Sequence, residues 1–194
     1  AAAAVDEMPQ EVAGGGGHSL VVKTDGSLVS WGTDVWGEVS DTPTGNDFAQ
    51  VSAGANHALA LKTDGSIVSW GSDMYGQVSD TPTGSGFLQV VAGYWHSLAL
   101  RADGSVVTWG SNDHGQVYWN PTGTDFVQVA SGGWHCLALK ADGSIVSWGR
   151  DDDGQVSDTP AGGNFAHVAG GWSHSLAIYA PALLLSATNL VAGQ

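Results

Sequence analysis

Short stretches of alternating small and large apolar residues recur along the chain, and each is followed by a turn signal. Residues 57–62 (HALALK) alternate Ala with Leu. This two-residue period is typical of a β-strand that packs on both faces. Asp64-Gly65 comes next, a pair that favours a type I′ turn in which both central residues have positive φ. Residues 66–70 (SIVSW) then return antiparallel, so a β-hairpin is predicted over residues 57–70.

Two further strands are predicted beside this hairpin. Residues 48–54 (FAQVSAG) form a strand before it, and Gly76-Gln77-Val78 forms a short outer strand after it. The polar residues 80–84 (DTPTG) then make a loop. The unit therefore holds three or four antiparallel strands in about 39 residues, which is the size of one β-propeller blade.

The unit repeats without a shift in register. Five histidines stand 39 residues apart, and each opens the same phrase: His18, His57, His96, His135 and His174. A fixed period of this length indicates a repeat architecture in which each unit buries its apolar face against its neighbours. We therefore expect an all-β fold, a β-propeller of about five blades with three to four antiparallel strands per 39-residue repeat.

The two ends of the chain are incomplete copies of the repeat. Residues 1–17 align with 40–56, and residues 174–194 align with 135–155. We therefore expect one propeller domain over residues 1–194, closed by pairing of the N- and C-terminal segments, so that residues 1–17 complete the last blade. The fifth repeat is degenerate, with Tyr179-Ala180-Pro181-Ala182 in place of the Lys-x-Asp-Gly turn. The alternative is a chain cut from a longer protein, with a tail that belongs elsewhere.

Charge and composition exclude several classes of partner. The net charge is −14, and four of the five basic residues recur at the repeat spacing instead of forming a cluster. Nucleic acids and anionic membrane surfaces are bound by concentrated basic surface, so neither is an expected partner. No apolar run reaches the roughly 18 residues of a membrane helix. The acidity favours a basic partner.

No catalytic, metal or cofactor site is predicted. A ring of five histidines invites a zinc or copper hypothesis, but no acidic or thiol ligand accompanies them at fixed spacing, so we expect them to lock the blades through backbone groups. Asp151-Asp152-Asp153 lacks the spacing of a calcium loop. Cys136, the only cysteine, stands where the other repeats have Ser or Ala. No nucleophile, base and acid together break the repeat symmetry.

The phrase VVAGYWHSLALRADGSVVTWGSNDHGQ (residues 90–116) resembles the repeat of the regulator of chromosome condensation family. The resemblance covers nearly the whole chain and implies a β-propeller. The compact repeat is similar to the short bacterial form found in propeller-type β-lactamase inhibitors, which implies a bacterial, secreted protein located outside the cell or on its surface. Family members typically have seven blades. This chain also has no room for the insertion used by the nucleotide-exchange members, so that activity is not implied.

Aromatic residues break the repeat symmetry at one end of the predicted blades. Because the hairpin turn lies at one end, the residues before each His and after each Trp-Gly must share the opposite end. Seven side chains at this end are the candidate partner-binding residues: Trp36, Tyr75, Tyr94, Trp95, His114, Trp134 and Trp172. Four other tryptophans recur every 39 residues and are predicted to be core: Trp31, Trp70, Trp109 and Trp148.

Variable loops on a rigid scaffold are common binding sites, and exposed Trp and Tyr supply large contact areas at low entropy cost. We therefore predict a non-enzymatic scaffold that recognises a protein partner through an aromatic-rich loop face. The resemblance agrees, because the corresponding face of the β-lactamase-inhibiting propeller grips its target. Three alternatives stay open. The rings could plug the channel mouth, the protein could be a carbohydrate-binding module, or it could be an architectural domain of a larger extracellular or surface protein.

Overall fold

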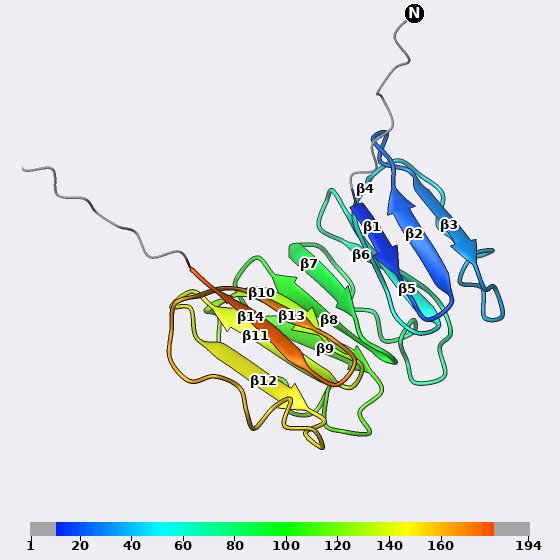
Figure 1. The fold of residues 1–194 in the computed structure, drawn as a ribbon. Helices are drawn as coiled ribbons and strands as arrows, with labels where there is room; N and C mark the ends of the chain where they lie inside the picture. Colours follow the sequence, from blue (N-terminus) through cyan, green and yellow to red (C-terminus); the bar gives the residue numbers. More distant parts are fainter. Residues whose placement is uncertain (1–10, 181–194) are drawn as a thin grey trace, which may run out of the picture.

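The structure is a computed structural model and describes residues 11–180, which form fourteen strands and no helix. The strands are grouped in five antiparallel sheets (Figure 1). The first three sheets contain β1 (Glu11–Gly14), β2 (His18–Val22) and β3 (Leu28–Gly32); β4 (Phe48–Ala53), β5 (His57–Lys62) and β6 (Ile67–Gly71); and β7 (Phe87–Ala92), β8 (His96–Arg101) and β9 (Val106–Gly110). The last two contain β10 (Phe126–Ser131), β11 (His135–Lys140) and β12 (Ile145–Gly149); and β13 (Phe165–Gly170) and β14 (Ser175–Tyr179). The predicted all-β fold with one blade-like sheet per repeat is confirmed.

The hairpin turn between β5 and β6 differs in type from the prediction. The N–H of Gly65 donates to the carbonyl of Lys62 at 2.9 Å, and the N–H of Lys62 donates to the carbonyl of Ser66 at 2.9 Å. Gly65 has a φ of 80°, whereas Asp64 is not among the described residues with positive φ. The turn is therefore a type I turn followed by a left-handed glycine, not a type I′ turn.

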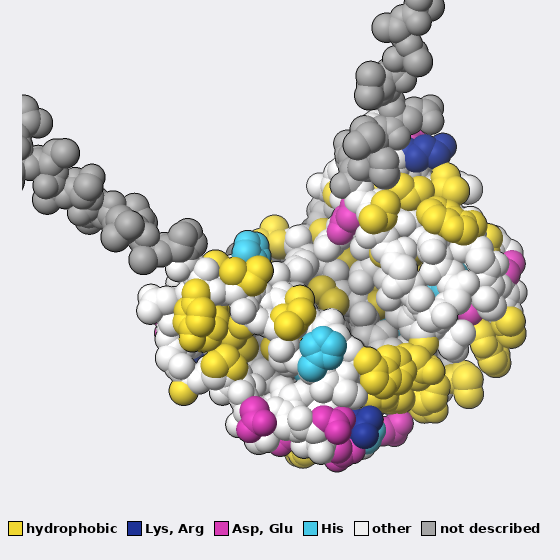
Figure 2. Space-filling model, viewed as in Figure 1, with side chains coloured by type: hydrophobic (Ala, Val, Ile, Leu, Met, Phe, Trp, Pro, Cys, Tyr) yellow, Lys and Arg dark blue, Asp and Glu magenta, His cyan; other side chains and the backbone are white. Residues whose placement is uncertain are grey.

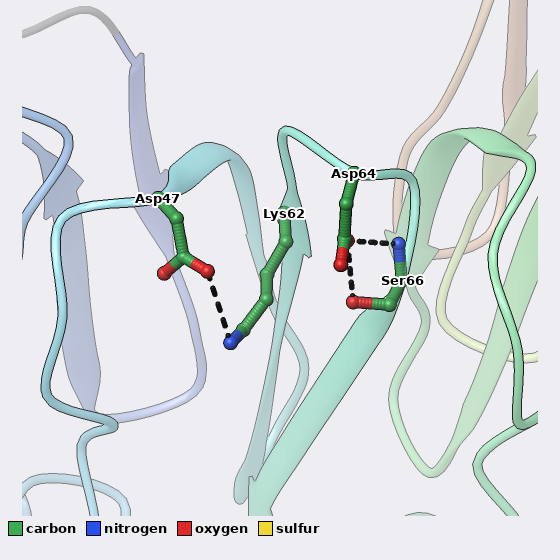
Figure 3. Close-up of polar contacts among 4 residues, drawn as sticks. All are labelled: Asp47, Lys62, Asp64 and Ser66. Atoms are coloured by element: carbon green, nitrogen blue, oxygen red, sulfur yellow. Dashed lines mark hydrogen bonds and ion pairs between the residues drawn. The ribbon is translucent and has the colours of Figure 1, made fainter.

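The side chain of Asp64 explains this turn. Its carboxylate accepts hydrogen bonds from the Ser66 backbone N–H at 2.8 Å and from the Ser66 hydroxyl at 2.6 Å (Figure 3). These bonds tie Asp64 to the residue two positions on, the usual local bond of Asp in turns. Lys62 forms an ion pair with Asp47 at 3.1 Å and thereby ties the hairpin to the loop before β4 (Figure 3).

The predicted outer strand at residues 76–78 is wrong. These residues belong to turns, so the first four sheets have three strands each and the described part of the fifth has two. The carboxylate of Asp73 accepts hydrogen bonds from the backbone N–H groups of Val78 and Ser79, both at 2.9 Å. Because this side chain satisfies the donors that a strand would use for pairing, the segment stays a compact turn.

Each sheet packs face to face on the next one, and the apolar core lies between them. In the second of these interfaces, Leu59 of β5 is buried against Val90 of β7 and Trp109 of β9. The Trp109 indole N–H also donates to the carbonyl of Gln77 at 2.9 Å. Three of the four repeated tryptophans share this environment, and Trp70, Trp109 and Trp148 are each 4% exposed. The core is thus built between repeats, as expected for a repeat protein.

Trp31 is the exception among the repeated tryptophans. It is 52% exposed, so the prediction that all four are core is wrong for this one. Trp31 lies in β3 of the first sheet, and the sheet that would cover it in the repeat pattern is not among the described residues. The environment of this position is therefore set by the neighbouring sheet rather than by the repeat itself.

The first strand pairs within its own repeat. β1 runs antiparallel to β2, with Val12 opposite Val21. Residues 11–14 therefore complete the first sheet, and the prediction that this segment completes the last blade is wrong for these residues. Only three residues separate β1 from β2, so this pairing closes a short loop at low entropy cost. The remainder of the predicted closure involves residues 1–10 and 181–194, which lie outside the described residues.

The five sheets follow one another around a hollow in an open arc (Figure 1). Among the described residues, β1 pairs only with β2, and β14 only with β13. The hollow has a volume of about 390 Å³ and is lined by the turns that precede each repeated histidine. Figure 2 shows it as a depression between two lobes. None of the described residues forms a helix long and apolar enough to cross a membrane.

Candidate functional site

The segments before each histidine and after each Trp-Gly do share one end of the sheets, as predicted. The N–H of Ser72 donates to the carbonyl of Asn56 at 2.7 Å, and the N–H of Ser111 donates to the carbonyl of Trp95 at 2.8 Å. The fourth sheet repeats this bond between Arg150 and Trp134 at 2.9 Å. We call this end the aromatic face. It comprises residues 15–17, 54–56, 93–95, 132–134 and 171–173, together with residues 33–37, 72–76, 111–115 and 150–154.

Backbone hydrogen bonds also join the turns of neighbouring sheets on this face. The N–H of Ala55 donates to the carbonyl of Tyr94 at 3.0 Å, and the N–H of Tyr94 donates to the carbonyl of Gly133 at 3.1 Å. The N–H of Gly133 donates in turn to the carbonyl of Trp172 at 3.1 Å, which extends this row of hydrogen bonds to the fifth sheet. The aromatic residues of successive repeats are thus held side by side by the backbone.

The aromatic rings form one continuous cluster centred on Tyr94. Its ring centroid lies 4.9 Å from that of Trp95, 5.1 Å from Trp134 and 4.8 Å from Trp172. Trp95 in turn stacks on Tyr75 at 5.0 Å and meets Trp134 edge-on at 5.0 Å. Such offset and edge-to-face pairs are the favoured arrangements of aromatic side chains.

Six of the seven predicted site residues are brought together in this way. The ring of His114 joins the cluster through Trp134 at 5.4 Å. Trp36, the seventh, lies on the equivalent loop of the first sheet and is about half exposed, and its ring contacts no other aromatic ring within residues 11–180. Tyr94, Trp95 and Trp134 are half-buried, whereas Tyr75 and Trp172 are exposed. The rings therefore cover one another and also present surface to solvent, and Tyr94 and Trp172 line the hollow.

Two exposed aromatic residues next to the cluster were not predicted as site residues. Tyr118 and Trp119 stand where the second repeat has Ser79-Asp80, and both are exposed. Trp119 and His114 line a groove of about 570 Å³ that also takes in residues 149–152. Because His114 contacts Trp134 as well, it connects the groove to the cluster. The replacement of Ser-Asp by Tyr-Trp was a visible signal in the sequence.

The aromatic face is strongly acidic. The four loops after Trp-Gly carry six aspartates and a single base, Arg150, whose Nε donates to Asp152 at 2.7 Å. The other four basic residues lie beside the hairpin turns at the opposite end, where Lys62 and Lys140 pair with aspartates. Figure 2 shows acidic side chains and one basic side chain next to a hydrophobic patch at the lower edge of the molecule.

Asp34 and Asp151 also fix the shape of their loops, in the same way as Asp73. The carboxylate of Asp34 accepts hydrogen bonds from the backbone N–H groups of Ser40 and Val39, and that of Asp151 accepts them from Ser157 and Val156. These backbone hydrogen bonds hold the pKa of both carboxyl groups below the usual range. The loops are therefore held in one conformation by charged groups, which is a form of preorganisation.

The repeated histidines lie below this face, and three of them connect neighbouring sheets. The Nε2 of His57 lies 2.9 Å from the hydroxyl of Ser97, and that of His135 lies 3.0 Å from Ser175. In the third sheet, His96 lies 2.9 Å from the hydroxyl of Ser131 and 3.2 Å from the sulfur of Cys136. The partner is thus a side chain of the next sheet, not the backbone group that the sequence led us to expect.

Burial keeps these imidazoles neutral. It lowers the pKa of His57 to about 4 and that of His96 to about 3, with the neighbouring histidines adding to the effect. Burial also raises the pKa of the Cys136 thiol well above its usual range, as for an inert buried cysteine. Within residues 11–180, no group of three or more His, Cys, Asp or Glu side chains is arranged to hold a metal ion.

A family model for the regulator of chromosome condensation (RCC1) repeat matches the chain three times, at residues 48–77, 87–116 and 126–155. These segments begin at β4, β7 and β10 and end in the loops of the aromatic face. Among curated proteins, none matches the chain.

Several solved structures share the fold. Human WBSCR16 superposes with a TM-score of 0.75 at 21% identity, over 90% of this chain and 60% of that one. The ectodomain of the Physcomitrella patens receptor kinase CR4 gives 0.73 at 24% identity, over 88% and 50%. Yeast RCC1 (Prp20), in its complex with Kap60, gives 0.72 at 21% identity, over 89% and 54%. The chain thus spans about half to three-fifths of the length of these proteins, and at these identities the likeness establishes the fold alone.

Proposed function

We propose that this chain, which is built from RCC1 repeats, is a non-enzymatic scaffold that binds a protein partner through its aromatic face. The observation that carries the proposal is the ring cluster centred on Tyr94, which joins residues of four sheets on an otherwise regular scaffold. A packing role alone does not need this cluster, because the first sheet has Gly16 and Gly17 where the third has Tyr94 and Trp95.

The arrangement supports a protein as the partner. Protein interfaces concentrate their binding energy in a few central Trp and Tyr side chains surrounded by a polar rim. Here Trp95 and Trp134 are half-buried at the centre, and the acidic loops form the rim. Carbohydrate modules use separate stacking platforms, whereas these rings form one irregular patch.

The charge of the face supports a basic partner. Six aspartates and one arginine in the four loops give a negative potential around an aromatic centre. Lys and Arg side chains are attracted both by that potential and by the faces of Trp and Tyr rings. We therefore propose that the contacting segment of the partner is rich in Lys or Arg.

Affinity capture from host extract tests the proposal. Three baits are compared by quantitative mass spectrometry: the wild-type chain, the double variant Trp95→Ala/Trp134→Ala, and Leu88→Ala. Leu88 is an exposed apolar residue at the start of β7, away from the aromatic face. We expect a protein that the wild type and Leu88→Ala retain and the double variant loses.

The capture has two contradicting outcomes. Equal recovery on all three baits would place binding elsewhere on the molecule. A glycan array that binds the wild type and not the double variant, with no protein captured, would replace the protein partner with a carbohydrate.

A further inference from the structure

A groove beside the aromatic cluster carries two exposed aromatic residues that lie outside that cluster. It has a volume of about 570 Å³ and lies between the loop after β9 and the loop after β12. His114, Tyr118 and Trp119 come from the first loop, and residues 149–152 come from the second. We call it the Trp119 groove. Its two loops belong to the third and fourth sheets, each of which packs against a described sheet on both sides.

The fold of the loop does not require a tryptophan at position 119. The N–H of Trp119 donates to the carbonyl of Gly115 at 3.0 Å. Asp80, at the same position of the second repeat, donates in the same way to Gly76 at 3.2 Å, so this turn also forms with a smaller polar residue. The Trp119 ring covers Gly115, where a Cβ would overlap it, yet Trp119 is 60% exposed. The rest of the ring is surface that the loop leaves available to a ligand.

The loop that carries these aromatic residues is fixed by side chains of its own repeat. The amide oxygen of Asn112 accepts hydrogen bonds from the backbone N–H groups of Val117 and Tyr118, at 3.0 and 2.8 Å. The Nδ2 of Asn120 donates to the carbonyl of Val106 at 2.8 Å and ties the loop to its hairpin. The loop is therefore held in place by its own hydrogen bonds, which lowers the entropic cost of binding a ligand there.

The Trp119 groove has an excess of negative charge. Its lining includes Asp113, Asp151 and Asp152 against one base, Arg150. The Nε of Arg150 donates to Asp152 at 2.7 Å, so this base is already engaged. Neither Asp113 nor Asp151 forms an ion pair within residues 11–180. The groove therefore combines two carboxylates that have no cationic partner in the described chain with an exposed aromatic ring.

The same chain places cations over aromatic rings at the opposite end of its sheets. The guanidinium of Arg101 lies 4.5 Å from the ring centroid of Phe87. Lys62 and Lys140 lie over phenylalanine rings at the equivalent positions of their own repeats. In the described part of the chain, no cation lies over Trp119 in this way. An indole attracts a cation more strongly than a phenyl ring does, so Trp119 can receive one from a partner.

We propose that the Trp119 groove binds one arginine side chain of the protein partner, with the guanidinium plane against the Trp119 ring and its N–H groups toward Asp113 and Asp151. The inference rests on the proposed function, because it gives one basic side chain of that partner a place on the aromatic face. Arginine fits better than lysine, since a planar guanidinium stacks on an indole and donates several hydrogen bonds to carboxylates at once. A phosphate or carboxylate group would be repelled by the two aspartates.

Nuclear magnetic resonance of the isotope-labelled full chain tests the groove without the partner. The backbone amide signals of residues 113–119 are followed while N-acetylarginine amide is added at constant ionic strength. Two matched probes are N-acetylcitrulline amide, which has a similar shape and no charge, and N-acetyllysine amide, which has the charge and no planar group. We expect a saturable shift of these signals with the arginine probe, weaker binding of the lysine probe and no binding of the citrulline probe.

Three variants locate the bound probe. Trp119→Asp restores the residue type of the second repeat and adds a negative charge, so attraction by charge alone would become stronger. We expect the arginine probe to bind at least roughly fivefold more weakly instead, because the contact with the ring is lost. Asp113→Asn should also weaken binding. Asp153→Asn removes an exposed carboxylate of the same face that does not line the groove, and it should bind the probe like the wild type.

A dispersed amide spectrum verifies that each variant is folded, and Trp119→Leu replaces Trp119→Asp if the latter is not. Shifts that do not saturate, or equal binding of the citrulline or lysine probe, overturn the proposal. So does tighter binding to Trp119→Asp, because charge alone would then explain the attraction. The two proposals fail separately. Probe binding without any captured partner contradicts the proposed function alone, whereas a captured partner that Trp95→Ala/Trp134→Ala loses, without probe binding, contradicts the arginine site alone.

Discussion

The repeated histidines show how one side chain connects two sheets. Each ring packs against the glycine three residues before it, and a Cβ on Gly54 would overlap the ring of His57. In His57, His96 and His135 the ring nitrogen also reaches a hydroxyl of the next sheet, as in the contact of His57 with Ser97. A structural role for these residues was predictable from their fixed spacing. Their partner was not, because it lies 40 residues away in the sequence and depends on how two sheets face each other.

Because the buried histidines are neutral, stability should depend on pH. The folded-state pKa values of His57 and His96 are about 4 and about 3, below the ordinary value of 6.5. Between these folded-state values and 6.5, the unfolded state therefore binds more protons than the folded state. The contribution of the neutral histidines to the free energy of unfolding is complete above about pH 7 and falls as the pH drops through 6.5 toward 4. At pH 5 the loss should be on the order of 2 kcal/mol for each of the two residues.

Urea unfolding at pH 7.5 and pH 5.0 measures this loss. The variant His57→Gln lowers stability at both pH values, but it should show a smaller difference between them than the wild type. Identical pH differences in the variant and the wild type would mean that His57 is not held neutral by burial.

Residues at the same repeat position do not share one environment, as the tryptophans of β3 and β9 show. Trp109 is buried between two sheets, and Trp31 is exposed on the first sheet. Replacement of Trp109 by Ala should lower the free energy of unfolding by about 3–5 kcal/mol, because it leaves a cavity in the core. Replacement of Trp31 by Ala at dilute protein concentration should cost about 1 kcal/mol or less, as for a surface position. Urea unfolding measures both variants. If Trp31→Ala and Trp109→Ala lowered the free energy of unfolding equally, Trp31 would not be an exposed side chain.

The strands were predictable to the extent that they depend on local patterns. The three strands of each complete sheet follow the alternation of apolar residues, and the DG turn marks each hairpin. The outer strand at residues 76–78 was not correctly predicted, because the carboxylate of Asp73 takes the backbone donors that pairing would use. The pairing of β1 with β2 was missed because the alignment of the two chain ends suggested a closed ring. The sequence pattern alone does not decide whether this strand pairs with the first repeat or with the last.

The two ends of the sheets differ in their balance of charge. Aspartates far outnumber basic residues on the aromatic face, whereas at the opposite end four of the five basic residues offset the aspartates of the hairpin turns. A basic partner should therefore be steered to the aromatic face, and its association rate should fall as salt screens the charges. Stopped-flow measurements with the captured partner at 50 and 500 mM NaCl should show a slower association at high salt. A rate that does not change with salt would contradict the electrostatic part of the proposal.

Removing rings from the cluster should also have a modest effect on folding. Trp95 and Trp134 contact each other and Tyr94, and such aromatic pairs contribute about 0.5–1.5 kcal/mol each. The double variant Trp95→Ala/Trp134→Ala should therefore be less stable than the wild type, but more stable than Trp109→Ala. Which residues share the face was predictable from the hairpin geometry, whereas the mutual stacking depends on side-chain conformations that the sequence does not reveal.

Isothermal titration of the captured partner with the wild type, Leu88→Ala and Trp95→Ala/Trp134→Ala tests the central claim most directly. Central aromatic anchors contribute about 2–4 kcal/mol each to binding, so the double variant should lose several kcal/mol of affinity while Leu88→Ala binds like the wild type. If the double variant binds as tightly as the wild type, or if it unfolds as readily as Trp109→Ala, the aromatic residues close the mouth of the hollow and are not the binding surface.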